Sequence, residues 1–343
     1  MTARERVLIA IGGNALYDKT GENNLDPAQV QAICQKIVAV VQQGYLPVIT
    51  FGNGPQVGNL LDMAETRARA SSRPIPLDTC VAWTQGEIGY ALSQELTNQL
   101  RGAECDLSVM AVNSTVVVAA EDPAFQKPTK PVGRFITPEE AQRLYMERGW
   151  IVGPDANRGY RRLVPSPKPI AVLEAPAIAG LLQQQVIVLC GGGGGIPVCW
   201  EASTQSYRGL EAVIDKDYTS CLLAKTLRLE HLVICTEVEY VYLHYGTPQQ
   251  TALEEITLAE AEAFDQQGQF AEGSMGPKVR ALMDYVRHGG KRAMITRLDC
   301  LTDALAGKTG TRIVASISQP AFQSTAVASQ AATVASQAAT PAS

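Results

Sequence analysis

The sequence predicts an α/β protein with a mostly parallel open sheet, and two observations support this prediction. First, short apolar runs end in glycine-bearing turns, as at residues 7–16, where five apolar residues lead into Gly12, Gly13 and Asn14. Such a run is typical of a strand buried on both faces. Second, helical segments alternate with the runs, which predicts parallel strands joined by right-handed crossovers. Because ligands bind at the carboxyl ends of such strands, we expect the turns to line a site.

The helices are indicated by capping residues and by one-sided apolar spacing. Asp26 is a suitable N-cap, Pro27 fits the first helical position, and Gly44 fits the position after the helix. Thr257 with Glu260 forms a capping box for a later helix that ends near Gly268. The other expected helices cover residues 56–70, 84–100, 218–227 and about 279–286. The other expected strands cover residues 46–50, 108–112, 115–119, 186–189, 231–235, 240–243, 292–296 and 312–314.

Composition divides the chain into a main folded unit at 1–315 and a tail at 316–343. Between about residues 121 and 168, proline and basic residues replace the long apolar runs, which predicts an inserted lobe that could act as a lid. The alternative is a surface excursion without a role. The tail repeats VASQAAT twice and has few large apolar groups, so we expect disorder or transient helix there.

Composition also excludes several classes of function. A net charge of −5 argues against a general nucleic-acid binder. The eight cysteines lack CxxC spacing and the three histidines lie far apart, so no metal site is expected. Cys190 and Cys235 fall inside apolar runs and are interpreted as buried thiols. With neither a signal peptide nor a run of membrane-spanning length, the chain is expected to be cytoplasmic.

The glycine turns and three lysines together suggest phosphoryl transfer. The turn at residues 191–195 leads into a strand, so it does not fit a dinucleotide fingerprint, and no GxxxxGK[ST] loop is present. Lys130, Lys216 and Lys278 each lie in a turn, where an ammonium can neutralise a moving phosphoryl group. Taken singly, each of these lysines is more simply interpreted as a solvated surface charge.

Two aspartates, Asp215 and Asp217, flank Lys216. One of these carboxylates could orient a lysine or hold a magnesium-bound nucleotide. The alternative is that both are ordinary acids at a helix N-terminus, where they interact with the helix dipole.

Nine sequence blocks make the chain resemble the carbamate kinases, of the amino-acid kinase superfamily, along nearly all of residues 7–314. The blocks are IGGNAL, GNGPQVGNLL, PLDTCVAWTQGEIGY, PTKPVG, RRLVPSPKP, GGGGIPV, GLEAVIDKD, VYLHYGTP and EGSMGPKV. The resemblance implies a three-layer αβα sandwich around a mostly parallel eight-stranded sheet, a lobe protruding over the site, and a homodimer. It further implies reversible transfer between ADP plus carbamoyl phosphate and ATP plus carbamate, with Mg²⁺.

The same resemblance assigns roles to individual residues. Lys216 and Lys278 would straddle the transferred phosphoryl group, Asp217 would organise them, and Lys130 would reach in from the lobe. The carbamoyl phosphate end would be bound by Gly12, Gly13, Asn14, Gly52 and Asn53. The nucleotide side would comprise Asp215, Tyr245, Gly246, Pro248, Met275 and Pro277. No general base is needed, because carbamate is already anionic.

Several positions depart from the pattern that the family commonly shows. Phe51 replaces a histidine, Asn113 and Ser114 replace Thr-Gln, and alanine replaces an aspartate at 119 or 120. The glycine run at 191–195 has one residue more than usual, and Glu239 replaces an aspartate. Two alternatives therefore stay open: a kinase of the same fold for another small acidic acceptor, or a non-catalytic nucleotide or metabolite sensor.

Overall fold

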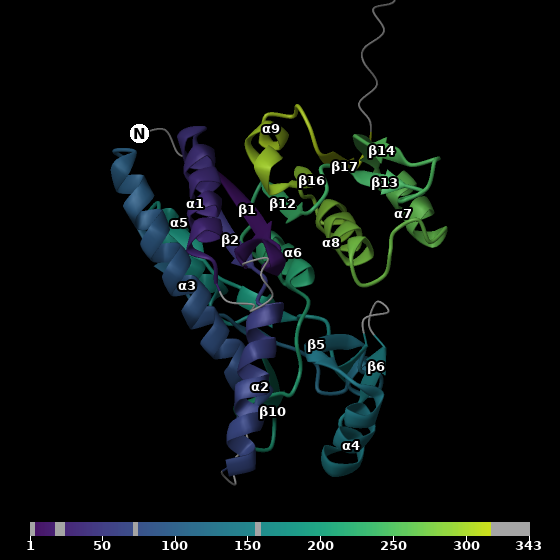
Figure 1. The fold of residues 1–343 in the computed structure, drawn as a ribbon. Helices are drawn as coiled ribbons and strands as arrows, with labels where there is room; N and C mark the ends of the chain where they lie inside the picture. Colours follow the sequence, from purple (N-terminus) through teal and green to yellow (C-terminus); the bar gives the residue numbers. More distant parts are fainter. Residues whose placement is uncertain (1–3, 18–24, 71–74, 155–158, 317–343) are drawn as a thin grey trace, which may run out of the picture.

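The computed structural model describes residues 4–17, 25–70, 75–154 and 159–316, and the predicted tail lies outside the described residues except for Ser316. An eight-stranded sheet runs through the body of the molecule (Figure 1). In spatial order its strands are β15 (Glu255–Thr257), β17 (Thr311–Val314), β16 (Arg292–Arg297), β12 (His231–Thr236), β1 (Glu5–Ile11), β2 (Tyr45–Phe51), β9 (Ile187–Leu189) and β3 (Val109–Ala111). Every neighbouring pair is parallel except β16 with β17, which confirms the predicted mostly parallel sheet.

The centre of the sheet is buried on both faces. All five residues from Val7 to Ile11 are fully buried, and Ile9 of β1 lies opposite Val233 of β12 and Ile49 of β2. Continuous apolar runs form such strands because helices cover both faces and leave no side that requires polar residues. The packed sheet fixes the strand ends, and therefore the turns that follow them.

Helices lie on both faces of this sheet (Figure 1). On one face α1 (Pro27–Gln42) packs against α3 (Leu77–Gly102) and α9 (Leu301–Leu305). On the other face α6 (Lys216–Thr226) packs against α8 (Met275–Arg287). The arrangement follows from right-handed crossovers, which place helices on opposite faces when the strand order reverses direction. The structure is therefore the predicted three-layer α/β sandwich.

Most predicted elements are present, with corrected boundaries. Asp26 caps α1 by accepting the Ala28 N–H, as predicted. The helix expected from residue 218 begins at Lys216, because Asp215 is its N-cap. The helix expected from residue 84 begins at Leu77. Prediction missed α5 (Ala175–Gln183), a short apolar segment whose periodicity does not separate helix from strand.

The predicted lobe forms a separate small layer beside the sheet (Figure 1). An antiparallel sheet in the order β5 (Lys130–Ile136), β7 (Tyr160–Val164), β6 (Val152–Pro154) packs on α4 (Pro138–Arg148). Thr137 caps α4 by accepting the Glu140 N–H at 3.2 Å. A second cluster, which includes Val132 of β5 and Val57 of α2 (Gly54–Ala70), joins the lobe to the body. The lobe is thus held directly against the helix that follows β2.

The remaining elements are short helices and strands in the segments between those already described. These are η1 (Gly13–Leu16), β4 (Thr115–Val117), η2 (Pro123–Phe125), β8 (Ala171–Val172), η3 (Gly192–Gly194), β10 (Ile196–Glu201), β11 (Ser206–Gly209), β13 (Val241–Leu243), β14 (Thr251–Leu253), α7 (Leu258–Gln266) and η4 (Leu298–Cys300). Thr257 and Glu260 form the predicted capping box of α7. Within the described ranges, no helix has the length and apolar character that crossing a membrane requires.

Candidate active site

The predicted glycine turns after β1 and β2 touch each other. The Gly52 N–H donates to the Ile11 carbonyl at 3.0 Å. A Cβ atom placed on Gly52 would lie 2.6 Å from the backbone nitrogen of Gly13, closer than real side chains approach. Only glycine therefore permits this contact, and the two turns form one bare stretch of backbone at the carboxyl edge of the sheet.

A third glycine turn, at residues 191–195, connects these turns to α6. Gly193 and Gly194 have positive φ angles of +64° and +89°, which glycine adopts without strain. Gly193 lies against the Asn53 side chain, and Gly194 lies against the carbonyl of Ile214, just before α6. The turns after β1, β2 and β9 therefore form one continuous surface with the start of α6.

Buried polar side chains fix these turns, and the sequence alone did not single out most of them. The Ser114 hydroxyl accepts the Gly191 N–H at 2.8 Å. Gln85 of α3 binds both backbone groups of Ser114, at 2.7 and 3.2 Å. Thr84, the neighbouring α3 residue, accepts from the Asn53 amide at 2.7 Å. Gln85 and Thr84 lie mid-helix, where only burial distinguishes them from surface residues.

Two sequence features near the turns have a structural explanation. Phe51 is 2% exposed, and a Cβ on Gly192 would lie 2.5 Å from its ring. The Phe51 ring therefore packs directly against the glycine turn. Asn14 donates to Glu237, at the end of β12, at 3.2 Å. The Asn14 amide is therefore oriented by an acid that the sequence analysis did not identify.

Beside the turns, Asp217 bridges two of the predicted lysines. The Lys216 ammonium lies 2.5 Å from one Asp217 oxygen, and the Lys278 ammonium lies 3.0 Å from the other. The Asp217 side chain is only 4% exposed. Lys216 and Asp217 start α6, whereas Lys278 lies in the first turn of α8, so the packing of these helices assembles the group. This group of three residues is called the lysine–aspartate cluster below.

The electrostatics of the lysine–aspartate cluster favour its ionised form. Burial alone would raise the pKa of Asp217, but the charges and hydrogen bonds of Lys216 and Lys278 lower it to about 2. At neutral pH the aspartate is therefore ionised. Two ammonium groups around one carboxylate leave a net positive charge, which suits an anionic ligand.

Lys130 connects the lobe to the start of α6. Its ammonium lies 2.8 Å from Asp215 Oδ2, while Asp215 Oδ1 accepts the Asp217 N–H at 2.9 Å. Arg162 of the lobe also pairs with Glu211, in the segment leading to α6, at 3.2 Å. Lys130 is thus next to the lysine–aspartate cluster. The nucleotide role expected for Asp215 stays a prediction, because both of its oxygens have protein partners here.

The residues expected on the nucleotide side lie on two neighbouring loops. Tyr245, Gly246 and Pro248 belong to the turn between β13 and β14, and Tyr245 is 65% exposed, with its ring tilted against that of Tyr242. The His244 N–H donates to Gln269 at 3.1 Å, which brings this turn beside the loop that leads into α8. Met275 and Pro277 lie in the first turn of α8, as does Lys278.

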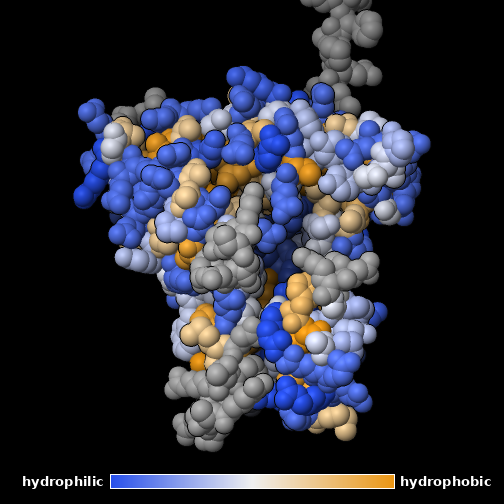
Figure 2. Space-filling view, viewed as in Figure 1, coloured by the Kyte–Doolittle hydropathy of each residue, from blue (hydrophilic) through white to orange (hydrophobic). Residues whose placement is uncertain are grey.

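The surface between the sheet body and the lobe is hollowed, with hydrophilic side chains in the recess (Figure 2). In Figure 1 the same region lies between α8 and β5, the elements that carry Lys278 and Lys130. The lysine–aspartate cluster and the glycine turns meet at the start of α6, so ammonium groups and bare glycine backbone N–H groups lie near one another. Such groups bind phosphate through charge and through hydrogen bonds.

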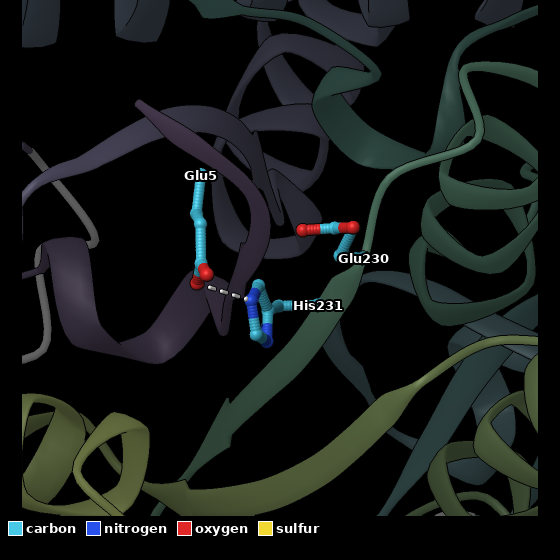
Figure 3. Close-up of side chains that lie close together, drawn as sticks. All are labelled: Glu5, Glu230 and His231. Atoms are coloured by element: carbon cyan, nitrogen blue, oxygen red, sulfur yellow. Dashed lines mark hydrogen bonds and ion pairs between the residues drawn. The ribbon is translucent and has the colours of Figure 1, made fainter. Parts of the chain in front are cut away.

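A group of possible metal ligands lies at the opposite edge of the sheet (Figure 3). Within the described ranges, Glu5, Glu230 and His231 are the one set of three such side chains close enough to share an ion. They lie at or beside the amino ends of β1 and β12, away from the glycine turns. His231 binds Glu5 at 3.0 Å, and Glu230 pairs with Lys291 at 2.6 Å. This group therefore takes no part in the candidate site.

Comparisons with known proteins agree with this geometry. The model of the amino acid kinase family matches residues 5–297. Curated carbamate kinases from Pyrococcus horikoshii and Staphylococcus haemolyticus are each 42% identical over 90% of this chain and 99% of their own length. The structure of carbamate kinase from Giardia lamblia bound to AMP-PNP superposes with a TM-score of 0.85 at 40% identity, covering 92% of this chain and 99% of that one. From matches of this extent, the chain belongs to the amino acid kinase family.

Proposed function

We propose that this chain is a carbamate kinase, which transfers a phosphoryl group reversibly between carbamoyl phosphate and ADP. The observation that carries the proposal is the lysine–aspartate cluster beside the joined glycine turns. Relatives named carbamate kinase, 42% identical over 90% of the chain, support the choice of substrate.

The chemistry requires charge compensation more than acid–base catalysis. In the direction of ATP synthesis, the bond between the carbamoyl oxygen and phosphorus breaks, and a terminal ADP oxygen forms the new bond to phosphorus. The carbamate leaves as an anion and ADP attacks as one, so no proton has to move. Lys216 and Lys278 neutralise the group in transit, while Asp217 keeps the two ammoniums apart and in place.

The two substrates are assigned to opposite sides of this cluster. Gly12, Gly13, Asn14, Gly52 and Asn53 form the side for carbamoyl phosphate, where bare N–H groups can bind oxygens. The loops that carry Tyr245, Gly246, Pro248, Met275 and Pro277 form the side for ADP, which enters as its Mg²⁺ complex. Mg²⁺ commonly binds through nucleotide phosphates and few protein groups, so the substrate brings its own metal.

Lys130 gives the lobe a part in the reaction. Its ammonium is paired with Asp215 and lies next to the lysine–aspartate cluster. An incoming phosphate would compete with Asp215 for this ammonium. We assign Lys130 to the transferred phosphoryl group, with the lobe covering the site as the exchange occurs.

A panel of substrates followed by ³¹P NMR tests the proposed function. The purified chain is incubated with MgADP and, in separate tubes, carbamoyl phosphate, acetyl phosphate or another acyl phosphate. Rapid ATP formation from carbamoyl phosphate is the expected result. Preference for a different acyl phosphate would assign another acidic acceptor, and nucleotide binding without turnover of any compound would indicate a sensor.

We further propose that two copies form a homodimer at the β3 edge of the sheet. β3 is an edge strand whose Met110 is 46% exposed, and Gly89 of α3 packs on Ala111 of that strand. Tyr90, the next residue of α3, is 66% exposed. Exposed apolar side chains on and beside an edge strand, which has one side without a partner strand, are typical of an interface. Light scattering should give twice the chain mass, and Met110→Glu should reduce it to one chain.

A cytoplasmic location is also proposed. All eight cysteines are free thiols, and burial raises the pKa of Cys190 and that of Cys235 to about 12. Buried, protonated thiols of this kind fit a reducing compartment, where disulfides are not maintained. Fractionation of the native cells, with detection of the chain in the cytoplasmic fraction, is the corresponding test.

A further inference from the structure

Gln56, in the first turn of α2, carries a buried amide without partners. The residue is 3% exposed, and in the part of the chain that the structure describes neither its Oε1 nor its Nε2 has a hydrogen-bond partner. Burying both groups of an amide removes their bonds to water without replacing them, which destabilises the folded protein. Native proteins rarely keep such groups, and those that remain require an explanation.

The position of Gln56 offers an explanation for its unpartnered amide. Its backbone N–H donates to the Tyr17 hydroxyl at 3.2 Å, directly after η1, which carries Gly13 and Asn14. The next residue, Val57, donates its N–H to the Asn53 carbonyl at 2.9 Å. One residue further, a Cβ on Gly58 would lie 3.4 Å from Gly133 in β5. The start of α2, which carries Gln56, therefore contacts the segment directly after η1, the Asn53 backbone and β5, which begins at Lys130.

The chemistry of the amide matches one end of the proposed substrate. A glutamine amide presents an acceptor and a donor side by side in one plane. The carbamoyl group also presents a C=O and an NH₂ in one plane, so the two can form a pair of hydrogen bonds. An acetyl group has the C=O but a methyl in place of the NH₂. A partner that satisfies both groups of Gln56 is thus a carbamoyl group rather than an acetyl group.

We propose that Gln56 is a specificity-determining residue that recognises the carbamoyl group of the substrate. Its Oε1 accepts from the carbamoyl NH₂, and its Nε2 donates to the carbamoyl oxygen. The inference rests on the proposed carbamate kinase activity and adds a reason for the choice of acceptor. A site built to bond a polar group discriminates strongly against an analogue that lacks it, because its own polar groups then stay unpaired.

Two matched glutamines make the proposal testable. Gln85 is equally buried, at 3% exposed, but both ends of its amide bind Ser114. Methionine has nearly the shape of glutamine without its polar groups. In the ligand-free protein, Gln56→Met is expected to raise the urea midpoint, whereas Gln85→Met is expected to lower it. A lowered midpoint in Gln56→Met would show that the amide already has partners and would overturn the proposal.

The kinetic arm compares carbamoyl phosphate with acetyl phosphate as phosphoryl donors to MgADP. Gln56→Met is expected to reduce the kcat/KM for carbamoyl phosphate relative to that for acetyl phosphate by about tenfold or more, mainly by lowering the value for carbamoyl phosphate. A ratio equal to that of the active wild type would overturn the proposal and leave the proposed function standing. If the wild type itself makes no ATP from carbamoyl phosphate, the proposed function fails, and the assignment of Gln56 fails with it.

Discussion

Replacing Asp217 by asparagine should separate the two effects of the lysine–aspartate cluster, on stability and on rate. Asparagine keeps the size of the side chain but removes the charge between Lys216 and Lys278. The pKa of Asp217 falls from 3.8 to about 2, which corresponds to roughly 2 kcal/mol of stabilisation. Leaving buried charges uncompensated commonly costs about 3–5 kcal/mol. We therefore expect Asp217→Asn to lose about 2–4 kcal/mol of unfolding free energy at pH 7.

Urea unfolding at several pH values measures this loss. A lowered pKa in the folded state means that the contribution of Asp217 is present above its unfolded pKa and disappears as the pH falls through the folded value. The difference in unfolding free energy between the wild type and Asp217→Asn should therefore decrease as the pH falls from about 4 to about 2. In the coupled assay of ATP formation, kcat should fall on the order of a hundredfold, because the two ammoniums lose their fixed positions.

Asp284 provides the control for Asp217. It also connects α6 to α8, through an ion pair with Lys225 at 2.5 Å, but its side chain is 39% exposed and it lies beyond the first turn of α8. A partly exposed pair contributes about 1 kcal/mol or less, so Asp284→Asn should be slightly less stable with wild-type kcat. Wild-type kcat in Asp217→Asn, or an equal loss of kcat in Asp217→Asn and Asp284→Asn, would refute the role given to the lysine–aspartate cluster.

Two further predictions concern the glycine turns and the opposite edge of the sheet. Gly52→Ala should lower the unfolding free energy by about 1–3 kcal/mol and raise the KM for carbamoyl phosphate, because the new Cβ would collide with Gly13. Gly54→Ala is the control: no atom lies within 4 Å of its added Cβ, so melting and kinetic assays should give wild-type values. Burial lowers the pKa of His231 despite its bond to Glu5, so folded stability should decline as the pH falls below about 6.5. In urea titrations at pH 8 and pH 5.5, His231→Gln should decline less than the wild type, and an equal decline would contradict this account.

The strand ends could be predicted from the sequence because their signals are local. An apolar run that stops at glycines indicates both the buried strand and the turn, as at Gly12 and Gly52. The capping residues Asp26 and Thr257 marked helix starts in the same way. Each of these features depends on residues within a few positions of one another.

The partners within the site could not be predicted in this way. Asp217 and Lys278 are 61 residues apart, and Lys130 and Asp215 are 85 apart, so both pairs depend on how distant elements pack. The sequence resemblance indicated that these residues belong to one site but not which carboxylate binds which lysine. Gln85 looked like one polar residue among many in a helix, and its contact with Ser114 exists only because α3 packs along the sheet.

The most direct test of the central claim is kcat for ATP formation from carbamoyl phosphate and MgADP in three lysine variants. Lys216→Ala and Lys278→Ala each remove one ammonium from Asp217, while Lys225→Ala removes an ammonium from the same helix as Lys216 that pairs with Asp284 instead. The account predicts a loss of about a hundredfold or more in the first two variants and nearly wild-type kcat in the third. Wild-type kcat in either Lys216→Ala or Lys278→Ala would contradict it.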